Sequence, residues 1–141
     1  MNDEDYYALT KSHRSSSCTG KKLLYKSKKI KKLELLHFYE NDLIYITLED
    51  DSSLIVYDMY GCYPVRTTIS TNDELDYAKD KIIENITFES VSTHKDNHGE
   101  EMITFINIHT SDYTYQFNVH SSHNGFYTCG DFKIEERLND V

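Results

Sequence analysis

The chain has 141 residues, of which 28% are charged and 38% hydrophobic, and it fits one domain of the usual size of about 100 to 150 residues. Its apolar runs fall well short of the roughly 18 residues that cross a bilayer, so we expect no membrane partner. The first residues are acidic, unlike a secretory signal, and three cysteines are too few for a disulfide scaffold. Both features predict a cytoplasmic protein.

The net charge of −9 conceals an asymmetry along the chain. Residues 1–32 hold nine Lys or Arg and three acidic residues, which gives a net charge of +6. Residues 33–141 hold six Lys or Arg and 21 acidic residues, which gives a net charge of −15. A negative body disfavours phosphate backbones, so we do not expect nucleic acid as a general partner. The basic segment either contacts nucleic acid or lies across the acidic body of its own or a neighbouring subunit.

The N-terminal part of the chain is polar and shows no sustained period, which predicts a flexible basic arm over residues 1–29. Residues 30–141 are expected to form a single β-rich domain. Runs of branched and aromatic residues over 33–38, 43–48 and 54–57 are separated by polar turns and predict three strands in meander order. We also expect a short strand over 65–69. Since Pro64 directly precedes it and proline is tolerated at sheet edges, this strand is predicted to be an edge strand.

One short helix is predicted over about 72–82. Thr71 and Glu74 have the spacing of a capping box, and Leu75, Ala78 and Ile82 fall on one helical face. Alternation resumes over 86–91, followed by a polar loop over 93–99. Residues 102–108 and 113–119 are expected to form a hairpin, and the Asn124-Gly125 turn signal predicts a further hairpin strand that reaches towards Ile134.

The predicted fold class is therefore α+β. We expect a mainly antiparallel β-sheet, or a partly open barrel, of about seven or eight short strands with one short helix. The absence of a strand–helix–strand rhythm excludes a parallel nucleotide-binding fold.

Histidines and cysteines are the residues on which a third hypothesis, a metal-dependent hydrolase, depends. His94 and His98, His120 and His123, and then Cys129 lie close together in sequence, and zinc uses such ligands. Their spacing is loose and there is no Cys-x-x-Cys pair, so we read them as ordinary polar residues and expect neither a metal nor an enzyme. The cysteines lack any local signature of a nucleophile.

Aromatic residues are unusually frequent, with 12 Tyr and six Phe. Alternation places Tyr113, Tyr115, Phe117 and Val119 on one strand face, where most such side chains form the core. Surplus tyrosines also suit stacking on a base or anchoring a protein partner. A phosphate on the body must use one of a few cations, namely Arg66, Lys79, Lys81, Lys95, Lys133 and Arg137.

Three segments together resemble small uncharacterised β-rich domains of phages and prophages: residues 43–50, Tyr57 with Gly61-Cys62 beyond it, and residues 117–127. In that family a strand ending near T-E-D-G leads to a tyrosine and a cysteine-containing loop, and the chain closes with an S-N-G-Y-Y hairpin. The resemblance covers about residues 30–135. Here Tyr63 follows Cys62 where the family has a second cysteine, and the closing hairpin reads H-N-G-F-Y.

Such domains are similar to phage anti-defence proteins, including anti-Thoeris sponges that trap cyclic ADP-ribose signals without cleaving them. The resemblance implies a non-enzymatic protein, without a cofactor, that counteracts host antiviral defence by sequestering a nucleotide-derived ligand. A stacking aromatic, a side-chain amide and an arginine suffice to hold adenine and pyrophosphate. The candidate ligand-binding residues are Arg66, Asn124, Phe126 and Tyr127.

An acidic protein-interaction module is the alternative function. In that case a tyrosine-rich, negative surface blocks a host protein that binds nucleic acid or acts in defence, and salt weakens the complex steeply. In either case we expect a homo-oligomer.

Overall fold

The computed structural model describes residues 25–39, 41–58, 67–97, 99–123 and 132–137. Within these ranges the chain forms eight strands and one single-turn 3-10 helix, η2. Their bounds are β1 Ile30–His37, β2 Asp42–Leu48, β3 Ser53–Asp58, β4 Ile69–Ser70, η2 Leu75–Ala78, β5 Ile83–Asp96, β6 Gly99–Thr110, β7 Thr114–His123 and β8 Phe132–Arg137.

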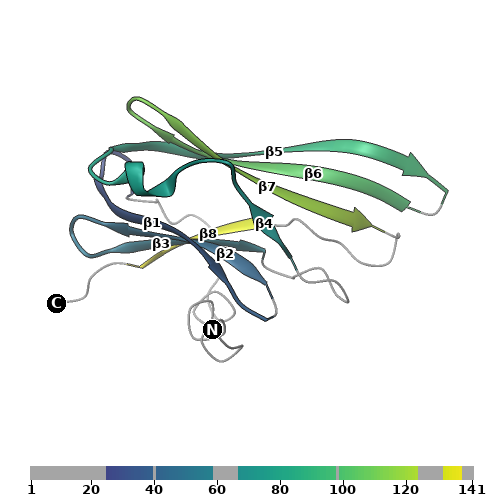
Figure 1. The fold of residues 1–141 in the computed structure, drawn as a ribbon, viewed down its shortest axis with the longest axis horizontal. Helices are drawn as coiled ribbons and strands as arrows, with labels where there is room; N and C mark the ends of the chain where they lie inside the picture. The colour runs from purple at the N-terminus through teal and green to yellow at the C-terminus, as the bar shows by residue number, and fades with distance from the viewer. Residues whose placement is uncertain (1–24, 40, 59–66, 98, 124–131, 138–141) are drawn as a thin grey trace.

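The strands form two antiparallel sheets of four strands each. The first sheet has the order β1-β2-β3-β8 and the second has the order β4-β7-β6-β5. Figure 1 shows the two sheets as separate layers, with the long β5–β6 hairpin extending beyond the shorter strands of the first sheet. The predicted antiparallel β-rich fold is confirmed, as a two-layer arrangement of sheets and not as a closed barrel.

The larger core cluster lies between the two sheets, and a smaller cluster of Phe38, Leu43, Ile55 and Tyr57 lies on the other face of the first sheet. Ile44 and Ile46 of β2 face the same cluster as Ile106 and Ile108 of β6, and all four are fully buried. Phe88 of β5, in the second sheet, stacks on Phe132 of β8, in the first sheet, with ring centroids 6.2 Å apart. Alternation with period two therefore explains which side chains hold the sheets together.

Backbone hydrogen bonds close one corner of the sandwich, where β1 begins. The Ile30 amide donates to the Lys81 carbonyl at 2.8 Å, and the Asp80 amide donates to the Ile30 carbonyl at 2.8 Å. Just before this corner Tyr25 is only 3% exposed and belongs to the core. The segment that enters β1 is thus packed against the domain from Tyr25 onward, although the sequence predicted an arm as far as residue 29.

A buried polar junction links the start of β2 to β4. Asp42 is fully buried, and its Oδ2 accepts the Ile69 amide at 2.8 Å while its Oδ1 lies 3.0 Å from His37 Nδ1. Beside it the Thr67 amide donates to Asn41 Oδ1 at 2.6 Å. These bonds satisfy backbone groups where the chain crosses from the first sheet to the second.

The predicted helix over about 72–82 is wrong, because only Leu75–Ala78 form a 3-10 turn. The turn ends at Lys79, Asp80 follows with a positive φ of 72°, and β5 begins at Ile83. The Asp73 side chain bonds to β7 and does not serve a helix. With so little helix in the described residues, the α+β label fits only loosely.

Two further predictions differ from the structure. The polar segment 93–99 is not a loop, because β5 continues to Asp96 and β6 starts at Gly99. The last strand, β8, pairs with β3 in the first sheet, so it does not extend the meander of β5, β6 and β7. The Asn124-Gly125 turn itself lies outside the described residues. No helix in the described ranges is long and apolar enough to span a bilayer.

Candidate functional site

A basic cavity lies beside the start of β1 and the η2 turn. Its volume is about 540 Å³, within the range of about 300 to 1,000 Å³ typical of small-molecule sites. Three lysines and one aspartate line it around two leucines and a threonine. The described lining residues are Lys31, Lys32, Leu33, Thr47, Leu75, Asp76 and Lys79.

The fold brings together lysines that are far apart in the sequence. Lys31 and Lys32 belong to β1, whereas Lys79 directly follows η2. The reciprocal hydrogen bonds between Ile30 and the 80–81 backbone hold these two segments side by side. Cations of the basic N-terminal segment and of the acidic body therefore meet at one cavity.

The three lysines differ in how far they are already paired. Lys31 Nζ contacts Asp51 Oδ1 at 2.9 Å, and Lys32 Nζ lies 3.6 Å from Glu34 Oε2. Lys79 is exposed and has no ion-pair partner among the described residues. Because exposed ion pairs are weak, an incoming anion can displace the carboxylates that contact Lys31 and Lys32. Lys79 has no such partner among the described residues to be displaced.

A further salt bridge, between Lys28 and Asp50, lies near the start of β1. Lys28 Nζ lies 2.9 Å from Asp50 Oδ2, and the Ser52 hydroxyl donates to Asp50 Oδ1 at 2.5 Å. The Ser52 hydrogen bond, followed by the Lys28 interaction, lowers the pKa of Asp50 to about 2. Together with the Lys31–Asp51 pair, this arrangement shows that part of the basic segment pairs with acids of its own chain, at the β2–β3 turn.

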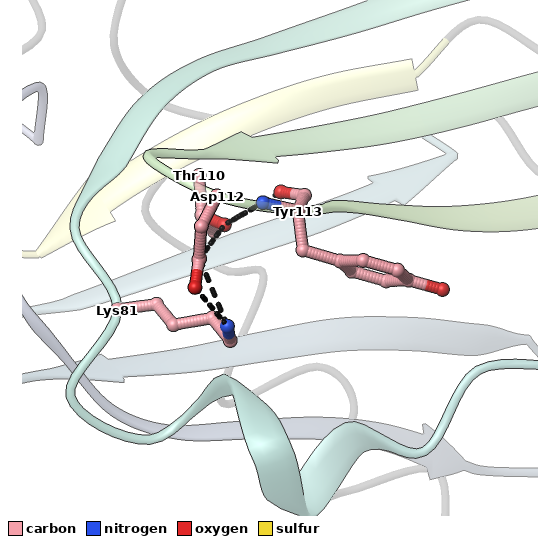
Figure 2. Close-up of polar contacts among 4 residues, drawn as sticks. All are labelled: Lys81, Thr110, Asp112 and Tyr113. Carbon is pink, nitrogen blue, oxygen red and sulfur yellow. Dashed lines mark hydrogen bonds and ion pairs between the residues drawn. The ribbon is translucent and has the colours of Figure 1, made fainter.

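Figure 2 shows the polar contacts that fix the β6–β7 turn to the chain just after η2. Lys81 Nζ contacts both carboxylate oxygens of Asp112 at 2.8 Å, and Thr110 Oγ1 accepts the Tyr113 amide at 3.2 Å. The hydrogen bond raises the pKa of Lys81 and lowers the pKa of Asp112. The Tyr113 ring points away from this pair, and its hydroxyl bonds to Asp73.

The predicted ligand-binding residues lie outside the part of the chain that the structure describes. They are Arg66, Asn124, Phe126 and Tyr127. His98 and Cys129 lie there too, while His94 is on β5 and His120 is on β7. Among the described residues no group of three potential metal ligands occurs.

Sequence reasoning found some members of the basic cavity but not their assembly. Lys79 is one of the few cations that the sequence places on the acidic body, and Lys31 and Lys32 lie at the end of the basic residues 1–32. No periodic pattern signals their convergence, since it depends on backbone pairing between residues about 50 positions apart. The predicted core role of Tyr115 and Phe117 is confirmed, whereas Tyr113 is 48% exposed.

Comparisons with known proteins give a family assignment and no described relative. No curated protein and no solved structure matches the chain. Residues 21–133, which include the basic cavity and both sheets up to the start of β8, match a family described as a domain of unknown function. The chain belongs to this family, DUF7448.

Proposed function

We propose that the protein is a non-enzymatic binding protein of phage type that counteracts host antiviral defence by holding a nucleotide-derived signal. The basic cavity carries this proposal, because three lysines and two leucines line it and its volume is suited to a nucleotide. Such a signal pairs a polyanionic phosphate group with an apolar base. The anti-defence role rests on the resemblance of residues 43–50 and 117–127 to phage domains.

Each part of the cavity has a role in holding such a ligand. Lys31, Lys32 and Lys79 supply charge-assisted hydrogen bonds to phosphate oxygens. The partly buried Leu75 offers apolar contact to the base, and the Asp76 carboxylate is suited to accept hydrogen bonds from ribose hydroxyls. Sequestration requires these contacts and no bond-breaking step.

Titration calorimetry with cyclic ADP-ribose and ADP-ribose tests this proposal. Lys79→Ala is expected to weaken binding about tenfold, because it removes the unpaired cation of the cavity. Lys133→Ala is the matched control, since it removes one lysine from β8 outside the cavity. Equal affinity of the two variants, or no heat with either ligand, contradicts the proposal.

The alternative, an acidic module that blocks a host protein, is supported by two exposed tyrosines. Tyr39 is 78% exposed and Tyr77 is 74% exposed, and such side chains are typical anchors of protein interfaces. Binding of a macromolecular partner that survives Lys79→Ala and weakens steeply with salt favours this function.

A further inference from the structure

The outer face of the second sheet carries neighbouring carboxamide side chains in the middle of its strands. The register places Thr87 opposite Asn107 and Asn107 opposite Gln116, and Phe105 opposite Asn118. Asparagine is depleted in strands because it packs poorly on a pleated surface. Residue types that disfavour a strand are expected within strands mainly at functional positions.

Much of the hydrogen-bonding capacity of these amides is unused within the described chain. Gln116 Nε2 donates to Asn107 Oδ1 at 3.0 Å, and no other side-chain bond of these two amides occurs in the described residues. Asn118 Oδ1 is shielded from solvent and has no hydrogen-bond partner within the described ranges of the chain. Such an oxygen costs free energy, so a rotation of the Asn118 side chain that brings it to a donor in the adjoining cleft recovers this cost.

A cleft of about 330 Å³ opens where these amides meet the connection between β4 and η2. Tyr113 and Thr114, at the start of β7, line the cleft together with Asn72 and Asp73 of the connection after β4. Asp73 is held firmly, because it accepts the Gln116 amide at 2.8 Å and the Tyr113 hydroxyl. The described residues that line the cleft are Asn72, Asp73, Tyr113, Thr114, Gln116 and Asn118.

The chemistry of this lining selects an uncharged ligand with many hydroxyl groups. None of the described lining residues is a lysine or arginine, and the one carboxylate already accepts two hydrogen bonds, so an anion gains nothing here. Carboxamides both donate and accept, as hydroxyl groups do. The half-exposed Tyr113 ring offers a flat apolar surface to the C–H face of a sugar.

We propose that this cleft binds a neutral saccharide, with Gln116 and Asn118 hydrogen-bonding its hydroxyl groups and Tyr113 packing on a sugar ring. The volume suits one or two sugar rings, at the lower end of the range of about 300 to 1,000 Å³ for ligand pockets. The proposal is independent of the basic cavity, since none of the described residues lines both sites.

Two-dimensional ¹⁵N NMR tests the proposal, because side-chain amide signals of Gln116 and Asn118 report directly on the cleft. The probes are maltotriose, cellotriose and N-acetylated chitotriose, each added up to about 10 mM because a site with few contacts binds weakly. At least one probe is expected to shift both side-chain signals in a saturable way. No shift with any of the three, or shifts of these signals by ADP-ribose and not by a saccharide, overturns the proposal.

Variants separate binding from folding. Asn118→Ala removes an unpartnered oxygen, so it is expected to keep the fold and to weaken saccharide binding at least fivefold. Asn85→Ala is the matched control, because Asn85 lies on the same strand face, opposite His109, outside the cleft. If both variants bind as the natural protein does, the amide assignment is wrong.

Discussion

The carboxylate of Asp73 accepts the backbone amide of Gln116 at 2.8 Å, where a neighbouring strand would otherwise supply a carbonyl. Thr71 completes this replacement, since its hydroxyl donates to the Gln116 carbonyl at 2.8 Å. Because β4 has only two residues, these side chains continue its pairing with β7. The connection after β4 therefore protects a sheet edge and fixes one wall of the amide cleft.

Asp73→Ala is expected to lower the free energy of unfolding by about 1–2 kcal/mol, because the Gln116 amide and the Tyr113 hydroxyl both lose their acceptor. Urea unfolding measures the change. Asp76→Ala is the control, since it removes an exposed aspartate three residues away on η2. Equal effects of the two substitutions would show that the Asp73 bonds contribute nothing specific.

Thr110→Val tests the β6–β7 turn. The Thr110 hydroxyl donates to the Tyr113 carbonyl at 2.5 Å and accepts the Tyr113 amide at 3.2 Å, and valine keeps the shape without these bonds. We expect a loss of about 1–2 kcal/mol of stability in urea unfolding. Ser111→Ala, at an exposed position of the same turn, is expected to change little; a similar loss there contradicts this explanation.

Stability between pH 6 and pH 2 depends in part on Asp50. Its pKa is lowered from 3.8 to about 2 in the folded protein, so its contribution is present above pH 3.8 and is lost as the pH falls towards 2. The stability difference between the natural protein and Asp50→Asn is therefore expected to shrink over this interval. Urea midpoints at several pH values measure it. A difference that stays constant down to pH 2 contradicts the assignment, and Glu84→Gln on β5 serves as the control.

Tyr25→Ala tests whether the segment before β1 belongs to the folded domain. Tyr25 is 3% exposed and packs in the core, and burial raises its pKa. Truncation of a buried aromatic side chain is expected to cost about 3–5 kcal/mol. Lys26→Ala, next along the chain and exposed, provides the comparison. An unchanged midpoint of thermal unfolding in Tyr25→Ala would mean that the segment before β1 does not contribute to the stability of the domain.

Local signals in the sequence were sufficient for most strands of the first and last hairpins. The β1–β2–β3 meander follows from branched runs separated by polar turns, and the β6–β7 hairpin follows from alternation around the 110–112 turn. These contacts join neighbours in the chain, so composition and period are enough to predict them.

Non-local pairing decided the features that the sequence did not reveal. β8 pairs with β3, although the Asn124-Gly125 signal suggested β7 as its neighbour. Thr71 and Asp73 bond to the edge of β7, and the helix that the Thr71–Glu74 spacing predicted does not form. The basic cavity likewise depends on the pairing of Ile30 with the backbone after Lys79.

Native mass spectrometry of the purified protein, alone and mixed with cyclic ADP-ribose or ADP-ribose, tests the proposed function most directly. The proposal predicts an adduct of one ligand per subunit, its recovery at unchanged mass after denaturation, and a weaker adduct in Lys79→Ala. The same spectra give the subunit number and so test the expected homo-oligomer. A protein without adduct in every mixture, or a ligand released with altered mass, contradicts the proposal of a non-enzymatic nucleotide-binding protein.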